Sequence, residues 1–191
     1  HHYLEATLTN SNPILHPSRI FGMLSDHVGD LYDREYLFYE EWDEKSSDVL
    51  IQCDTEFQQI VNKLPIHQDE IPCLLDYYES TDVQSLTQKI RSIQAFKGIK
   101  MCMIPQENGQ FAIDYSNRYF TEDIPYGLLI IKSLGLLLEV PTPTIDQVIY
   151  WTQEHMGKCY LVEGQLTGKD IKESGVVSNY QIHSLTSLLN L

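Results

Sequence analysis

The sequence lacks a glycine-rich nucleotide-binding loop. No Gly-x-Gly-x-x-Gly occurs in its 191 residues, and no run of alternating strand and helix patterns is found along it. Both features accompany the parallel sheet that binds dinucleotides in many dehydrogenases. A nucleotide-binding domain of the Rossmann type is therefore absent from this chain.

Basic residues are also scarce. Lysine and arginine number 13 against 27 acidic residues, which gives a net charge of −14. Such a charge disfavours binding to nucleic-acid backbones and to anionic membranes, so we expect neither partner. The most apolar run, residues 128–140, contains Lys132 and is shorter than the roughly 20 residues that span a bilayer.

No cysteine pair has the Cys-x-x-Cys spacing, and no signal peptide opens the sequence. We therefore expect reduced thiols in a cytoplasmic protein. His155 and Cys159 lie four positions apart, but two ligands make a poor zinc site, so we predict no metal. The four cysteines are Cys53, Cys73, Cys102 and Cys159.

Length and composition fit a single domain. The hydrophobic share of 42% is ordinary, and 191 residues suffice to bury a core. His1 and His2 fit the remnant of a purification tag, so we expect one helical domain over residues 3–191 that begins near Tyr3 and is a fragment of a longer protein.

Apolar residues that recur at steps of three and four predict helices. The first predicted helix runs from Pro17, which suits a first turn, to Gly29. The second is capped by Ser46 or Ser47 and stopped by Pro65. Its apolar stripe consists of Leu50, Cys53, Phe57, Ile60 and Leu64.

The rest of the chain continues this pattern with few interruptions. Residues 31–42 are aromatic and acidic without a clean period, which indicates an irregular or short β connection. Residues 105–116 form a predicted loop with a brief strand over 111–115. The other predicted helices follow Pro72 and cover 82–96, 123–139, 143–155 and short stretches near 167–173 and 178–189. The sequence therefore predicts an all-α fold.

Two short segments hold the groups that proton transfer beside an anion requires. Residues 12–19 (NPILHPSR) contain His16, and residues 118–127 (RYFTEDIPYG) contain Arg118 and Asp123. An imidazole titrates near neutral pH and can give and take a proton. A guanidinium binds carboxylate or phosphate in a bidentate way. Together they indicate acid–base chemistry next to an anionic substrate.

His16 and Asp123 each allow a structural interpretation as well. His16 can cap a helix or pack in the core. Asp123 can be the N-cap of the apolar helix that follows it. Alternatively, its carboxylate can accept a hydrogen bond from His16 and fix the ring's tautomer, and a carboxylate has lone pairs enough for both roles.

The polar neighbours of these two residues are open to similar alternatives. Arg118 lies five residues before Asp123, in a predicted loop, and either faces a substrate cleft or pairs with Glu122 on the surface. Asn12 either orients a substrate or makes the turn before Pro13.

Two further basic residues are expected to play no part in the site. Arg19 falls one turn into the first predicted helix and is expected to be solvated. Lys132 interrupts an apolar helix, and its long side chain is expected to reach water.

The order of the motifs carries a family resemblance. Asn-Pro-x-x-His-Pro at 12–17 is followed by Arg-Tyr-x-x-Glu-Asp-x-Pro-Tyr-Gly at 118–127 and Val-Pro-Thr-Pro at 140–143. In these motifs the chain, from about Tyr3 onward, resembles the helical C-terminal domain of the octopine/nopaline (opine) dehydrogenases. The resemblance implies a multi-helix substrate domain, like the C-terminal domain of 6-phosphogluconate dehydrogenase, in a two-domain enzyme.

That resemblance also implies an activity and its partners. Opine dehydrogenases join an L-amino acid to a 2-keto acid such as pyruvate by reductive amination. NAD or NADP would be bound mainly by an N-terminal Rossmann domain, so this chain alone would be inactive. An apolar face left where that domain docks could also support a homodimer.

Residue roles follow from the same resemblance. His16 would be the general acid–base group, with Asp123 as its orienting partner. Arg118 and Asn12 would contact substrate or cofactor phosphate.

Another class of function stays open from the sequence alone. The chain could be a helical ligand-binding or dimerisation module without catalysis. A glycine-rich βαβ unit encoded upstream would favour the enzyme. Relatives of ketopantoate reductase or 6-phosphogluconate dehydrogenase are a weaker alternative, because their lysine-centred site is not found here.

Overall fold

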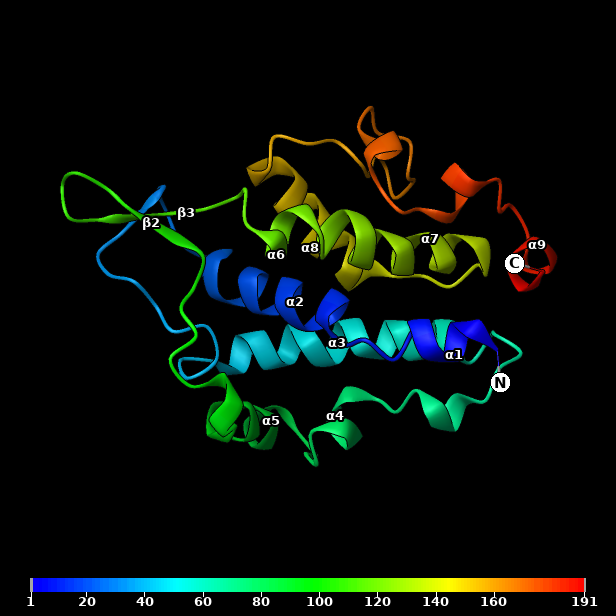
Figure 1. The fold of residues 1–191 in the computed structure, drawn as a ribbon, viewed down its shortest axis with the longest axis horizontal. Helices are drawn as coiled ribbons and strands as arrows, with labels where there is room; N and C mark the ends of the chain where they lie inside the picture. The colour runs from blue at the N-terminus through cyan, green and yellow to red at the C-terminus, as the bar shows by residue number, and fades with distance from the viewer. Residues whose placement is uncertain (1, 191) are drawn as a thin grey trace.

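A computed structural model describes residues 2–190 of the chain (Figure 1). His1, half of the predicted tag remnant, lies outside these residues. The described chain is mostly helical with one small sheet, which confirms the predicted all-α class.

Two antiparallel helices form the centre of the molecule. Helices α2 (Asn12–Leu24) and α3 (Glu44–Val61) lie side by side and run in opposite directions (Figure 1). Apolar stripes on both helices are buried, as amphipathic periodicity requires. The α3 stripe predicted from the sequence is confirmed, because all of its members are buried: Leu50, Cys53, Phe57, Ile60 and Leu64.

Other helices cover both sides of this pair. Helices α4 (Leu74–Tyr77) and α5 (Val83–Ser92) pack on one side of α3 (Figure 1). Helices α7 (Leu129–Leu137) and α8 (Pro143–His155) pack on the other side. The central pair is therefore enclosed between two helical layers.

The first and last helices meet at one end of the molecule. Helices α1 (Tyr3–Thr7) and α9 (Leu185–Leu189) lie at the end opposite the sheet (Figure 1). The Tyr3 hydroxyl donates a hydrogen bond to the Leu188 carbonyl. Two 3₁₀ turns, Ile171–Glu173 and Val177–Tyr180, lead from α8 to α9.

The small sheet is antiparallel, in the order β1–β3–β2. Strand β1 (Leu31–Tyr32) lies in the connection predicted to be irregular or short β. Strand β3 (Phe111–Ile113) confirms the brief strand predicted there. Strand β2 (Met103–Pro105) was not predicted, because its hydrophobic pattern is too short to read.

Both central helices begin earlier than the sequence pattern predicts. Helix α2 starts at Asn12 with Pro13 in its first turn, so Pro17 stands inside the helix and removes one backbone hydrogen bond. Helix α3 is capped by Asp43, whose carboxylate accepts a hydrogen bond from the Ser46 N–H at 2.7 Å. The predicted cap at Ser46 or Ser47 is therefore wrong.

The segment before α7 differs from the single helix predicted over 123–139. A short helix α6 (Arg118–Thr121) comes first, so Arg118 is helical and not in a loop. A π-helical turn, Ile124–Leu128, then leads into α7. Pro125 has no N–H to donate, and the Asp123 N–H reaches back five residues to the Arg118 carbonyl at 3.2 Å. The helix is therefore widened at Asp123.

Other helix predictions hold with shorter bounds. Helix α8 matches the prediction over 143–155. Helix α5 ends at Ser92, and a 3₁₀ turn, Gln94–Phe96, fills the rest of the predicted stretch. Another 3₁₀ turn, Gln68–Glu70, precedes α4.

Two basic residues expected to reach solvent are buried instead. Lys132 is 4% exposed, and its Nζ lies 2.6 Å from an Asp146 carboxylate oxygen and 3.0 Å from the Thr142 hydroxyl. Asp146 lies in α8 and Thr142 directly precedes it, so the lysine has partners without reaching water. Arg19 is 0% exposed, with partners described below.

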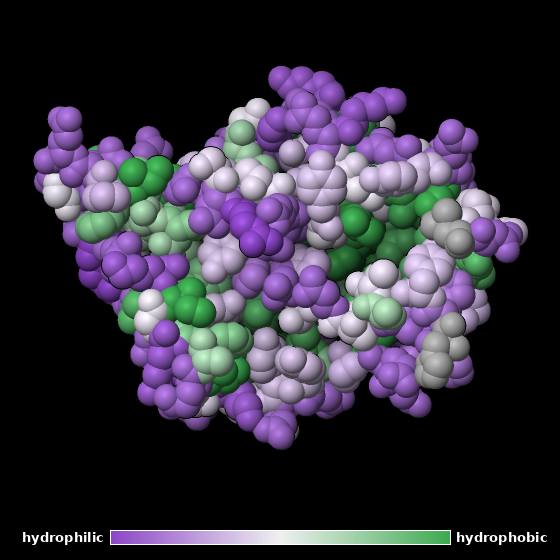
Figure 2. Space-filling model, viewed as in Figure 1, coloured by the Kyte–Doolittle hydropathy of each residue, from purple (hydrophilic) through white to green (hydrophobic). Residues whose placement is uncertain are grey.

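Hydrophilic residues cover most of the viewed face, and hydrophobic ones show near α7 and in further groups at the end that carries the sheet (Figure 2). Within residues 2–190, none of the helices combines the length and the apolarity that crossing a membrane requires.

Helices α2 and α3 approach each other closely at Gly22. A methyl group there would lie 2.6 Å from the Ser46 Cα and 2.8 Å from its backbone nitrogen. Helix propensity alone favours Gly22→Ala by about 1 kcal/mol. We expect the clash to dominate, since overpacking costs about 1–3 kcal/mol. Urea unfolding should show a less stable variant, and equal or higher stability would contradict this packing.

Acid should weaken the fold through Glu5. The His67 N–H donates to its carboxylate at 2.9 Å, and this bond chiefly lowers the pKa of Glu5 from 4.5 to about 2. A depressed carboxyl pKa adds stability that is present above pH 4.5 and is lost as pH falls toward 2. Glu5→Gln should therefore be less stable than the parent at pH 6, with the difference shrinking below pH 4.5.

Urea unfolding across this pH range measures that difference. Glu154→Gln is the matched control, because Glu154 is exposed and its side chain makes no hydrogen bond within the described chain. A difference between parent and Glu5→Gln that stays constant with pH would contradict the assignment.

Candidate functional site

His16 lies in the middle of α2, buried between two oxygen partners. Its Nδ1 is 2.7 Å from an Asp123 carboxylate oxygen, and its Nε2 is 2.9 Å from the Tyr39 hydroxyl. The structure thus brings together the imidazole and the carboxylate that the sequence singled out, although they lie 107 residues apart.

The two partners define how the ring is protonated. An ionised carboxylate only accepts hydrogen bonds, so Nδ1 carries the hydrogen that Asp123 receives. Burial raises the pKa of Tyr39 above its ordinary value, so the phenol keeps its proton. The Tyr39 hydroxyl donates to Nε2 of the neutral ring and can accept from it when the ring is charged.

Asp123 is placed by the widened helix and does not act as a cap. It precedes the π-helical turn, but its side chain makes no capping hydrogen bond. Its carboxylate faces His16 instead, and its side chain is partly exposed. Of the two interpretations of Asp123, the structure shows the contact with the histidine and not the N-cap.

A hollow of about 520 Å³ opens beside this pair. His16 and Asp123 form part of its wall, and so do Asn12 and Arg118, so the four predicted site residues border one cavity. The rest of the wall comes from residues beside strands β2 and β3 and from α6 and its flanking residues. These are Lys100, Met101, Cys102, Met103, Asp114, Asn117, Tyr119 and Glu122.

Arg118 is exposed at the rim and already has a partner. Its side chain is 82% exposed, and its Nε and Nη2 lie 2.9 and 2.8 Å from one Glu122 carboxylate oxygen. This hydrogen bond chiefly raises the pKa of Arg118, so the guanidinium stays charged. The surface pairing considered for Arg118 is thus the one observed, and the pair sits at the mouth of the hollow.

Asn12 lies at the start of a helix and not in the turn considered for it. It is the first residue of α2, directly before Pro13, and it also borders the hollow. Its backbone N–H is held by the Asn10 side chain at 3.1 Å, while its own amide makes no hydrogen bond within residues 2–190.

Aromatic rings enclose the imidazole on its other sides. The Tyr119 ring centre lies 4.6 Å from that of His16, and the Phe38 ring lies 5.6 Å away. Sequence reasoning missed Tyr39 and Tyr119. The signal for Tyr39 was the aromatic density of residues 31–42, which has no period that could point to one residue, whereas Tyr119 stands in the motif at 118–127.

Charged groups of both signs surround the hollow. Lys100 pairs with Glu35, and Asp114 binds the nearby Ser116 backbone. Across the described residues, no three His, Cys, Asp or Glu side chains gather closely enough to hold a metal ion. With an imidazole in its wall and a guanidinium at its mouth, the hollow can exchange a proton with a ligand and bind an anion.

Comparisons with known proteins show which family the chain belongs to. The sequence model of the family described as NAD/NADP octopine/nopaline dehydrogenase, alpha-helical domain, matches residues 1–156. Octopine dehydrogenase from Mizuhopecten yessoensis is 31% identical and tauropine dehydrogenase from Arabella iricolor 32% identical, each over 199 residues. Each match covers 98% of this chain, and the chain spans about half the length of these relatives: 49% and 50%.

Solved structures show the same relationship. Octopine dehydrogenase in complex with NADH and agmatine matches with a TM-score of 0.88 and 30% identity, over 98% of this chain and 49% of that one. Its complex with NADH and L-arginine matches with a TM-score of 0.86 and 31% identity, over the same shares. The chain therefore belongs to the octopine/nopaline dehydrogenase family, and it corresponds to the family's alpha-helical domain.

Proposed function

We propose that this chain is the substrate-binding and acid–base half of an opine dehydrogenase-like oxidoreductase. The enzyme would join an L-amino acid to a 2-keto acid by NADH- or NADPH-dependent reductive amination. The observation that carries the proposal is the 2.7 Å contact between His16 and Asp123 at the wall of the hollow. An imidazole held by a carboxylate is a proton donor and acceptor of fixed orientation.

The relatives support the substrate class. Solved structures of octopine dehydrogenase contain NADH with L-arginine in one case and NADH with pyruvate in another. An amino acid and a keto acid both carry a carboxylate, and the hollow has an arginine at its mouth. Condensation of the amine with the carbonyl gives an imine and releases water. Protons move as the imine forms and as the water leaves, and an imidazole can carry them.

Both nitrogens of His16 are occupied, so the ring must exchange a partner to meet a substrate. The Asp123 bond is charge-assisted, and such bonds are roughly twice as strong as neutral ones. The Tyr39 bond is neutral. We infer that the substrate oxygen or nitrogen replaces the Tyr39 hydroxyl at Nε2, while Asp123 keeps Nδ1 and stabilises the charged ring.

Arg118 can also change partners at little cost. Its ion pair with Glu122 is solvent-exposed, and exposed pairs contribute little to stability. A substrate carboxylate can therefore take over the guanidinium in a bidentate way. The Asn12 amide borders the same space and can bind the same anion.

The cofactor would be held mainly outside this chain. Residues 2–190 contain no parallel sheet, since their one sheet is antiparallel. We infer that NAD or NADP is bound mainly by a second, N-terminal domain, and the exposed Arg118 is suited to contact a cofactor phosphate. When bound, the nicotinamide supplies the hydride that reduces the imine, and this chain supplies position and protons.

Removal of the imidazole should abolish most activity. In the full-length enzyme, His16→Ala should lower kcat by about 10²–10⁴-fold, the usual contribution of general acid–base catalysis. Asp123→Asn should also lower kcat, because the amide does not stabilise the charged ring. The measurement is oxidation of reduced nicotinamide with pyruvate and a panel of L-amino acids.

His183→Ala is the matched control, since His183 is exposed and lies outside the hollow. It should retain the parent kcat. Parent-like turnover by folded His16→Ala would remove His16 from the mechanism. No turnover by the parent with any substrate pair would favour a non-catalytic module.

Tyr39→Phe should destabilise the fold through the histidine. It leaves the buried Nε2 without a partner, and an unsatisfied buried polar group costs about 1–3 kcal/mol. Tyr119→Phe is the matched control, because that hydroxyl makes no hydrogen bond within residues 2–190 and its ring packs on the same imidazole. Urea unfolding compares the two, and equal losses would show that the Tyr39 bond contributes nothing.

A further inference from the structure

Helix α2 carries a buried charged residue, Arg19, three positions after His16, and its contacts reach the segment that supplies Tyr39. Arg19 is 0% exposed, in a chain with a net charge of −14. It lies on the face of α2 that meets residues 37–43, the segment that supplies Tyr39. A buried charge requires several partners to offset its lost hydration.

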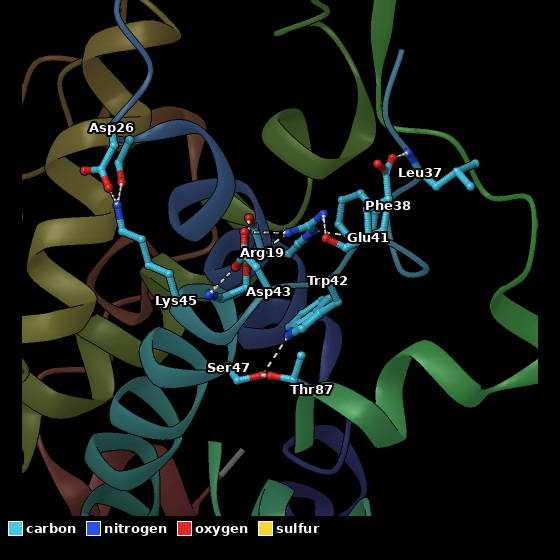
Figure 3. Close-up of polar contacts among 12 residues, drawn as sticks. Arg19, Asp26, Leu37, Phe38, Glu41, Trp42, Asp43, Lys45, Ser47 and Thr87 are labelled. Carbon is cyan, nitrogen blue, oxygen red and sulfur yellow. Dashed lines mark hydrogen bonds and ion pairs between the residues drawn. The ribbon is translucent and has the colours of Figure 1, made fainter. Parts of the chain in front are cut away.

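The Arg19 guanidinium binds the backbone of that segment (Figure 3). Its Nε donates to the Phe38 carbonyl at 2.8 Å, and its Nη2 donates to the Glu41 carbonyl at 2.8 Å. Its Nη1 donates to the Ser46 hydroxyl at 3.1 Å and lies 3.3 Å from an Asp43 carboxylate oxygen. The two carbonyls bracket Tyr39 in sequence.

The segment is also anchored on its far side. The Trp42 indole N–H donates to the Ser47 hydroxyl at 2.9 Å, and that hydroxyl is 2.6 Å from the Thr87 hydroxyl (Figure 3). The Arg19 guanidinium lies over the Trp42 ring at 5.6 Å. These contacts fix the end of the segment after Tyr39, while Arg19 spans both of its flanks.

We propose that Arg19 is a positioning residue for the acid–base site: by clamping the carbonyls on either side of Tyr39, it holds the Tyr39 hydroxyl on Nε2 of His16. The contacts of the clamp are observed, and only their consequence for acid–base chemistry rests on the proposed function. His16 and Arg19 thus lie on the same face of α2. His16 is the imidazole of the site, and Arg19 positions Tyr39, the partner of that imidazole.

The planar fork of arginine suits this task and lysine does not. Arg19 donates in three directions at once, whereas an ammonium on a flexible stem reaches only some of these acceptors. Burial lowers the pKa of Arg19 to about 10, an effect partly offset by Asp43 and Glu41. The side chain therefore remains charged at neutral pH and keeps all its donors.

Access to Nε2 tests the clamp without reference to turnover. Diethyl pyrocarbonate acylates unprotonated imidazole nitrogens, and mass spectrometry of peptides gives the rate for each histidine. In full-length Arg19→Lys, the rate at His16 should rise roughly 2–10-fold, the factor that corresponds to one hydrogen bond of ordinary net strength. The rates at the exposed His155 and His183 should not change, which separates local release from general destabilisation.

A double variant tests whether the effect passes through Tyr39. Tyr39→Phe alone should also raise the His16 rate, and Arg19→Lys combined with Tyr39→Phe should exceed the faster single variant by little. Arg34→Lys is the control, since Arg34 pairs with the Glu41 carboxylate on the exposed side of the same segment and should leave the rate unchanged.

Three outcomes would overturn the proposal: an unchanged His16 rate in folded Arg19→Lys, an equal rise in Arg34→Lys, or single effects that multiply in the double variant. If Arg19→Lys does not fold, Asp43→Asn replaces it, since asparagine can still cap α3 but loses the charge beside Arg19. For Asp43→Asn, a rise in the acylation rate at His16 that is smaller than the rise expected for Arg19→Lys supports the clamp, and no rise contradicts it. Because acylation does not depend on catalysis, an inactive enzyme would leave this result intact.

Discussion

The hydrogen bond between His16 and Asp123 is the contact on which the candidate site depends. It joins the central helix α2 to the widened turn before α7, across 107 residues of sequence. Two backbone features must coincide for it to form. Helix α2 has to begin at Asn12 so that His16 lies well inside it, and the helix that follows Arg118 has to widen at Asp123. Proline contributes to both, at Pro13 and Pro125.

The groups around that bond differ in how readily they change partners. The His16–Asp123 bond is charge-assisted and partly buried, so it is the costliest to break. The bond to Tyr39 is neutral, and the pair between Arg118 and Glu122 is exposed. A ligand entering the hollow therefore finds two replaceable contacts beside one durable contact. This order of strengths gives His16 a constant tautomer and leaves Nε2 and the guanidinium available.

The sequence predicts the residues of the site better than their surroundings. His16, Asp123 and Arg118 could be assigned to one candidate site because they stand in two motifs that carry the family resemblance. Tyr39 could not, since it belongs to an irregular segment with no period. The burial of Arg19 could not be predicted either, because two of its acceptors are backbone carbonyls of that segment.

Lys132 escaped prediction for a related reason. Its partners, Thr142 and Asp146, come from the start of the next helix, and only the packing of α8 on α7 brings them within reach. The hydrophobic pattern of a helix predicts which of its faces is buried. It does not predict which polar residues of another helix contact that face. The helix ends were misplaced in the same way, because Asp43 caps α3 from outside its apolar stripe.

The burial of Arg19 is consistent with the irregular connection that it contacts. Backbone carbonyls outside helices and strands still need donors once they are buried. Arg19 supplies two such donors to residues 38 and 41, where no regular strand does so. The energetic cost of desolvating one guanidinium is thereby offset in part by hydrogen bonds to two carbonyls of an irregular segment. Since that segment carries Tyr39, a buried arginine is a physical reason why the irregular connection can hold one hydroxyl at a fixed place beside the imidazole.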